Sequence, residues 1–141
     1  MTFACSTTDK TILLIEDWIG HARLIRMALA EAGVDLPVIH VIDGKQAASL
    51  LFTRNGQALP SVIMLDLSLP DMPGGDLLAR IRHDPDTRGL PVIALSAADI
   101  PEDRQCCLRL GCEGFLVKPP DPPEIRVVFG QLGLLARAAA E

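Results

Sequence analysis

The sequence lacks the features that would place this chain in a membrane or on nucleic acid. No apolar run approaches the ~20 residues that a membrane-spanning helix needs. The opening segment Met1–Ser6 has neither a basic start nor a long apolar stretch, so it does not resemble a signal peptide. The net charge is −5 and the basic residues are dispersed, which argues against nonspecific nucleic-acid binding. We expect a cytoplasmic protein whose partners include neither membranes nor nucleic acids.

The four cysteines also lack a recognised pattern. Cys5, Cys106, Cys107 and Cys112 form neither a Cys-x-x-Cys pair nor a Cys/His zinc spacing. Cys106 and Cys107 are adjacent, so their side chains would diverge on a helix. Ordinary reduced thiols are the favoured interpretation, and a redox role stays open as the alternative.

Length and composition are typical of one globular domain. A chain of 141 residues buries roughly two-thirds of its unfolded surface on folding. Its 49% apolar and 22% charged residues are ordinary for such a domain. The pattern shows no linker, repeat or second domain. We predict a flexible tail over residues 1–9 and one domain over residues 10–141, with no output domain.

Short apolar runs alternate with helical patterns, which is typical of βα units around a parallel sheet. The unbroken hydrophobicity of runs such as Ile12–Ile15 indicates strands that are buried on both faces. Short, right-handed crossovers favour the strand order 2-1-3-4-5. The predicted fold class is therefore α/β, a flavodoxin-like doubly wound (βα)5 sandwich with a parallel five-stranded sheet. The predicted strands are 11–15, 37–42, 61–66, 91–96 and 114–117, and the predicted helices are 19–32, 45–54, 74–83, 101–110 and one capped by Asp121.

Polar side chains follow four of these five apolar runs. The first run ends at Glu16 and Asp17, the third at Asp66, the fourth at Ser96 and the fifth at Lys118. Open α/β sheets bind their ligands at the carboxyl ends of the strands. The predicted strand order brings Asp17 beside Asp66, with Ser96 and Lys118 flanking them. We therefore expect these side chains to form one site.

The chemistry of this set points to phosphoryl transfer. Carboxylates that converge in one crevice raise one another's pKa unless a cation neutralises them, and oxygen ligands suit Mg²⁺. An ionised Asp66 could then attack a phosphoryl group and form an acyl phosphate. Mg²⁺, the Lys118 ammonium and the Ser96 hydroxyl would each meet one phosphoryl oxygen. Each residue alone could be an ordinary turn residue, helix cap or surface charge. Their ordered placement at the strand ends together favours a functional site for phosphoryl transfer.

In these residues the sequence resembles the receiver domains of two-component response regulators, over roughly residue 10 to the end of the final helix. The stretches Ile12–Asp17, His83–Pro85 and Leu90–Val92 look particularly like stand-alone receivers associated with bacterial phytochrome-type kinases. The matching positions are the acidic pair Glu16-Asp17, the phosphoacceptor Asp66, the switch hydroxyl Ser96, the switch aromatic Phe115, and Lys118-Pro119, for which the resemblance implies a cis peptide bond.

The resemblance implies a metal site and a phosphoryl donor. Asp17, Asp66 and the backbone carbonyl of Ser68 would bind Mg²⁺ directly, and Glu16 would act through water. The donor would be the phosphohistidine of a histidine kinase or of a histidine phosphotransfer protein. The chain would not be an enzyme for other substrates, because it would catalyse only its own phosphorylation and dephosphorylation.

The resemblance also implies a switch. Phosphorylation would draw Ser96 toward the phosphoryl group and let Phe115 turn inward, which would remodel the surface of the fourth helix, fifth strand and fifth helix for a downstream protein. The closing helix is more apolar than one core stripe requires once Val127 and Leu134 are added to its other apolar residues, which are Ile125, Val128, Phe129, Leu132, Leu135 and Ala136. A broad buried face and a homodimer or partner contact through this surface both explain that excess.

Three positions at the rim of the site, together with Ser68, either differ from many receivers or affect access to the phosphoryl group. Trp18 stands where many receivers carry a small polar residue, and it would act either as a packed lid or as a partner contact. Ala97 is small enough to leave the path of the phosphate open. Ser68 and Ala98 lie where the family tunes access of the attacking water, and both are small, so we expect no unusually long phosphoryl lifetime.

Two other functions are compatible with parts of this pattern. One is a pseudo-receiver that binds proteins without being phosphorylated, which the intact acidic set disfavours. The other is an aspartyl phosphatase of the haloacid-dehalogenase type, which would need a second acid where Ser68 stands. The histidines His21, His40 and His83 fall on separate elements, so we expect no metal or catalytic role for them.

Overall fold

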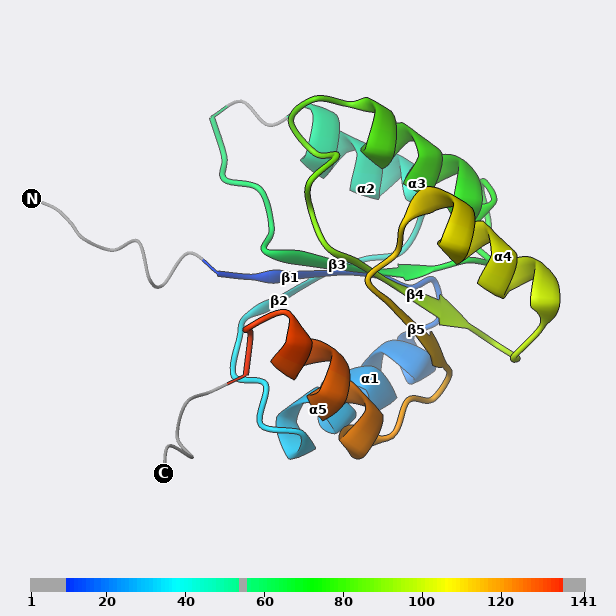
Figure 1. Cartoon of the computed structure of the whole chain (residues 1–141). Coiled ribbons are helices and arrows are strands. Elements are labelled where there is room, and N and C mark those ends of the chain that lie inside the picture. Colours follow the sequence, from blue (N-terminus) through cyan, green and yellow to red (C-terminus); the bar gives the residue numbers. More distant parts are fainter. Residues whose placement is uncertain (1–9, 54–55, 136–141) are drawn as a thin grey trace, which may run out of the picture.

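The computed structural model describes residues 10–53 and 56–135, which form alternating strands and helices (Figure 1). The tail predicted at residues 1–9 lies outside the described residues. The strands are β1 (Ile12–Ile15), β2 (Val38–Val41), β3 (Val62–Asp66), β4 (Val92–Ser96) and β5 (Gly114–Val117). The helices are α1 (Ile19–Glu31), α2 (Gly44–Phe52), α3 (Gly74–His83), α4 (Pro101–Leu110) and α5 (Pro122–Gln131).

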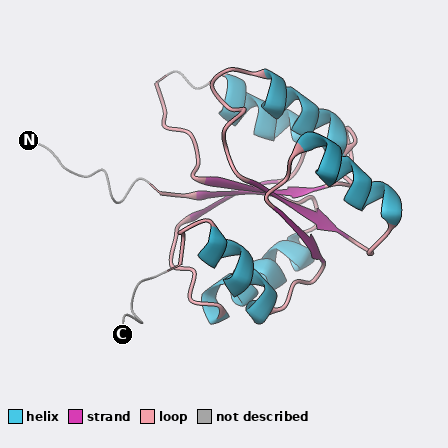
Figure 2. Cartoon of the chain, in the orientation of Figure 1, coloured by secondary structure: helices cyan, strands magenta, loops and turns pink. Residues whose placement is uncertain are grey.

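The five strands form one parallel sheet in the order β2-β1-β3-β4-β5, which confirms the predicted flavodoxin-like topology. Helices α2, α3 and α4 cover one face of the sheet, and α1 and α5 cover the other (Figures 1 and 2). The register aligns the carboxyl ends of the strands, because Ile15 pairs with Leu65 and Ser96 pairs with Val117. The residues that follow these strands therefore start from one edge of the sheet.

Alternate residues of each central strand pack into different cores. Ile12 and Leu14 join the cluster beneath α1 and α5, whereas Leu13 and Ile15 join the cluster beneath α2 and α3. All four side chains are almost fully buried. This two-sided burial is the reason that the strand sequences are uniformly apolar rather than alternating.

Helix ends follow the sequence signals closely. Asp121 and Glu124 form the capping box that begins α5, as predicted. Gly111 ends α4 with φ 69°, a left-handed conformation that glycine adopts without strain. The Lys118-Pro119 peptide is cis, as the resemblance implied. Most predicted boundaries differ from the observed ones by only one or two residues; α2, for example, starts at Gly44 and ends at Phe52.

The apolar excess of the closing helix is mostly accounted for by the core. Ile125 and Phe129 are fully buried, and Val128, Leu132, Leu134 and Leu135 pack partly against the same cluster. Val127 is the exception, with 60% of its surface exposed. Separately, none of the helices in the described ranges is both long and apolar enough to cross a membrane.

Candidate functional site

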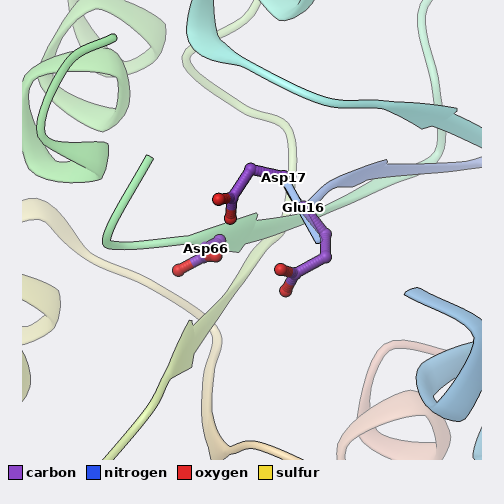
Figure 3. Close-up of side chains that lie close together, drawn as sticks. All are labelled: Glu16, Asp17 and Asp66. Atoms are coloured by element: carbon purple, nitrogen blue, oxygen red, sulfur yellow. The ribbon is translucent and has the colours of Figure 1, made fainter. Parts of the chain in front are cut away.

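Three carboxylates meet at the carboxyl ends of two adjacent strands. Glu16 and Asp17 follow β1, and Asp66 is the last residue of β3 (Figure 3). One carboxylate oxygen from each residue lies within 4.8 Å of the others. Glu16 and Asp66 are buried, whereas Asp17 is exposed at the mouth of the cluster. The predicted convergence of these acids is therefore present in the fold.

Lys118 joins this cluster from the end of β5. Its ammonium lies 3.0 Å from Glu16 Oε1 and 3.0 Å from Asp66 Oδ2, and only 6% of its side chain is exposed. Burial alone would lower the pKa of Lys118, but its hydrogen bonds to Asp66 and Glu16 raise that pKa above its usual value. One buried cation thus bridges two buried anions.

The carboxylate of Asp66 is fixed at both oxygens. Oδ1 accepts a hydrogen bond of 2.9 Å from the Ser68 N–H, and Oδ2 accepts the bond from Lys118. Burial raises the pKa of Asp66 above its usual value, and the hydrogen bonds from Ser68 and Lys118 partly offset that rise. The loop after β3 therefore helps to hold the carboxylate in one orientation.

Gly74 allows this loop to fold back against β3. Its N–H donates to the Leu67 carbonyl at 3.0 Å. A Cβ atom at position 74 would lie 2.5 Å from the Asp66 carbonyl oxygen and 2.6 Å from Leu67 Cα. Only glycine fits this close approach of the two backbone segments.

Two histidines lie beside Glu16, which the sequence pattern did not indicate. His40 Nε2 is 2.7 Å from the Glu16 carbonyl oxygen, and His21 Nδ1 is 3.6 Å from Glu16 Oε2. The Trp18 N–H donates to Glu16 Oε2 at 3.2 Å. These contacts position Glu16 from α1 and from β2. Pairwise spacing could not reveal the two histidine contacts, because they join separate elements.

Trp18 lies at the start of α1 and is 58% exposed. Its ring meets the His21 ring edge to face, with 4.3 Å between the centroids. The same ring covers the position where a Gly20 Cβ would project. The tryptophan is thus anchored on its own helix while more than half of its surface remains open to solvent.

Ser96 is buried at the end of β4, and its hydroxyl is already engaged. Ser96 Oγ lies 2.5 Å from Asp103 Oδ2 and 2.5 Å from the Ala98 carbonyl oxygen. It also accepts a hydrogen bond of 3.2 Å from the Ala98 N–H. A hydroxyl has one proton, so it donates to only one of the two oxygens at a time. Ala97 and Ala98 are both exposed in the loop that follows.

Phe115 is half-buried on β5, and Arg104 covers its ring. The guanidinium carbon of Arg104 lies 4.5 Å from the ring centroid, and the same guanidinium is paired with Asp99. Asp103 and Arg104 are consecutive residues of α4. Together they contact both residues that were predicted to switch, Ser96 and Phe115. Sequence analysis missed them because acidic and basic residues on a helix surface are ordinary.

A parallel sheet that carries buried acids, a hydroxyl and a lysine along one edge is the arrangement of a receiver domain of two-component systems. Residues 12–129 match the response regulator receiver domain family. The chain belongs to this family.

Its relatives include regulators associated with phytochromes. Response regulator Rcp1 of Synechocystis sp. is 31% identical over 116 residues, covering 80% of this chain and 79% of Rcp1. The structure of Mn²⁺-bound Rcp1 aligns with a TM-score of 0.70 at 28% identity and covers 87% of this chain and 88% of that one. The bacteriophytochrome response regulator RtBRR aligns with a TM-score of 0.79 at 31% identity, covering 90% and 80% of the two chains. The structure of the phosphorylated cyanobacterial phytochrome response regulator RcpA aligns with a TM-score of 0.74 at 30% identity and covers 92% of this chain and 96% of that one.

Proposed function

We propose that this chain acts in the cytoplasm as a response regulator that accepts a phosphoryl group on Asp66. The donor is the phosphohistidine of a histidine kinase or of a histidine phosphotransfer protein. The observation that carries the proposal is the buried Asp66 carboxylate, which Ser68 and Lys118 hold at its two oxygens beside Glu16 and Asp17. The alignment with phosphorylated RcpA supports the same reaction here.

The donor set suits Mg²⁺. Three carboxylates carry three negative charges when ionised, and the one ammonium of Lys118 leaves two uncompensated, which matches a divalent cation. All the ligands are oxygens, as Mg²⁺ requires. We assign direct binding to Asp17, Asp66 and the Ser68 carbonyl, with Glu16 acting through water. The ion would neutralise charge on the phosphoryl oxygens as the group is transferred.

Each residue of the site then has a separate role in phosphoryl transfer. An Asp66 oxygen forms the new O–P bond while the N–P bond of the donor breaks, so no base is needed to activate the ionised nucleophile. Lys118 shifts its hydrogen bond from Asp66 to a phosphoryl oxygen, and Ser96 meets another. The small side chains of Ser68 and Ala98 leave room for the water that later hydrolyses the acyl phosphate. The chain would thus catalyse only its own phosphorylation and dephosphorylation.

The output is a change of surface on α4, β5 and α5. A phosphoryl oxygen competes with Asp103 for the Ser96 hydroxyl, and the inward turn of Phe115 removes the ring from Arg104. Leu108 is 82% exposed on α4 and Val127 is 60% exposed on α5. These side chains give the surface apolar contacts for a downstream protein or a second copy of the chain.

The proposal is tested with acetyl phosphate or beryllofluoride in the presence of Mg²⁺. With acetyl phosphate, wild type should gain the mass of one phosphoryl group. With either reagent the fluorescence of Trp18, the only tryptophan, should change because its backbone is bound to Glu16. Asp66→Asn should show neither response, whereas Asp71→Asn, in the same loop, should retain both. A mass gain that survives in Asp66→Asn would contradict the assignment. No response in wild type would favour a phosphorylation-independent binding module.

A further inference from the structure

The end of α4 brings two thiols together. Cys107 lies in the last turns of this helix, and Cys112 follows Gly111, whose left-handed backbone reverses the chain. The Cys112 N–H donates to the Cys107 carbonyl at 3.0 Å. Bonds of this kind define a Schellman motif, in which the two side chains commonly touch. Here both side chains line one pocket, and each thiol perturbs the pKa of the other.

A small reactant can reach both sulfurs. Cys107 and Cys112 line a pocket of about 200 Å³ between α4 and β5, together with Arg104, Leu108 and Phe115. Cys107 is 7% exposed and Cys112 is half-buried. The three described cysteines are unbridged in this structure. The pair is therefore a dithiol with a route from solvent.

The surroundings of the two thiols differ in a way that suits oxidation. Interaction with the Cys112 thiol lowers the pKa of Cys107 in spite of its burial, whereas interaction with Cys107 raises the pKa of Cys112. The thiolate is the reactive form, so Cys107 is the more reactive sulfur and Cys112 lies beside it to complete a disulfide. Cys106 instead faces Gly75 of α3, where a Cβ would lie 3.0 Å from its sulfur.

We propose that Cys107 and Cys112 form a reversible intramolecular disulfide when a hydroperoxide enters the pocket. The Cys107 thiolate attacks the peroxide, the O–O bond breaks, and the sulfur becomes a sulfenic acid; the departing hydroxide or alkoxide takes up the proton that the Cys107 thiol released on ionising and leaves as water or alcohol. The Cys112 sulfur then attacks the Cys107 sulfur, the S–O bond breaks, and hydroxide takes the Cys112 proton to leave as water. The two thiols lose two electrons and the peroxide gains them.

This modification site is separate from Asp66, and its formation does not depend on phosphorylation. The disulfide would join the last turns of α4 to the segment that leads into β5. Phe115 and Arg104 line the same pocket, so oxidation would alter the surface beside the predicted switch aromatic. Disulfides that open and close in reducing compartments are characteristically regulatory rather than structural.

The test treats the full chain with hydrogen peroxide, blocks the remaining thiols with iodoacetamide and maps tryptic peptides by mass. Cleavage after Arg104 and Arg109 places Cys107 and Cys112 in different peptides. We expect these peptides to be linked through one disulfide that dithiothreitol reverses. The link should persist in Cys106→Ser and in Asp66→Asn, and it should be lost in Cys107→Ser.

A second variant identifies the attacking sulfur. In Cys112→Ser the reaction should stop at the sulfenic acid, which dimedone would trap on Cys107. A link that is lost in Cys106→Ser but persists in Cys107→Ser would overturn the proposal. So would cross-links that form only between chains, or alkylation of both thiols in wild type after peroxide treatment.

Discussion

The carboxylate of Asp103 contacts the hydroxyl of Ser96 at 2.5 Å, across the loop that joins β4 to α4. The hydroxyl that is assigned to the phosphoryl group therefore has a partner before any phosphoryl group arrives. In the proposed mechanism phosphorylation displaces this contact, which links the site directly to the first turn of α4.

Asp103→Ala should therefore make the protein respond more readily. A hydrogen bond to a charged group contributes about 1.5–3 kcal/mol, so its loss from the unphosphorylated state should tighten beryllofluoride binding roughly tenfold or more. Titration of Trp18 fluorescence measures this change. Glu102→Ala removes an exposed carboxylate from the same turn and is the matched control. Equal effects of the two substitutions would show that charge, rather than the Ser96 contact, is responsible.

Lys118→Met should destabilise the metal-free protein by about 3–5 kcal/mol, because it leaves two buried carboxylates without their cation. Urea denaturation measures the loss. The same substitution in a Glu16→Gln background should cost less, since one of the two charges has already been removed. If both backgrounds lose the same stability, the ion pair is not the source of the effect.

Gly74→Ala and Gly75→Ala should have opposite consequences although the residues are neighbours. At position 74 the new methyl group meets the backbone of Asp66 and Leu67, and such overpacking costs about 1–3 kcal/mol. At position 75 it meets only the Cys106 sulfur, at 3.0 Å, a side chain that can shift, and alanine is a better helix former than glycine by at most about 1 kcal/mol. Thermal unfolding should show a lower midpoint for Gly74→Ala alone. Two equal decreases would contradict this account.

Asp71 should make stability depend on pH. Its carboxylate accepts the N–H groups of Gly44 and Lys45 at 2.9 Å each, so it caps α2 from the loop after β3. The Gly44 hydrogen bond is the main cause of a pKa below the usual value for Asp71. A group with a lowered folded-state pKa stabilises the fold above its unfolded pKa, and this contribution is lost as pH falls through the folded value.

Urea midpoints between pH 7 and pH 3 check this expectation. Asp71→Asn should be less stable than wild type at neutral pH, and the difference should shrink at the acidic end of the range. Asp35→Asn, which removes another exposed carboxylate, is the control. A difference between Asp71→Asn and wild type that stays constant over the whole range would rule out the titration of Asp71 as its cause.

The sheet and the acidic cluster could be predicted because their signals are local. Each strand is a short apolar run, and Glu16, Asp66, Ser96 and Lys118 directly follow or end such runs. The strand order then places them together without knowledge of any side-chain contact. The capping box at Asp121 is likewise contained within four residues.

The contacts that the sequence did not indicate join residues of different elements. Asp71 caps α2 from a distant loop. The predicted start at residue 45 did not include this contact, and the helix in fact starts at Gly44. Arg82 donates to the carbonyls of Leu90, Leu110 and Gly111, which ties α3 to the end of α4. These partners depend on packing between elements and on side-chain reach, neither of which periodicity encodes.

The bond between Lys118 and Glu16 has a consequence for biosynthesis, because it joins residues 102 positions apart in the chain. A ribosome releases Glu16 and Asp66 well before Lys118, so these carboxylates cannot gain their ammonium partner until β5 emerges. Closing so long a loop is costly in entropy and belongs to the late stages of folding. If Asp66 accepts a phosphoryl group as proposed, its complete site would therefore form only once the last strand is in place.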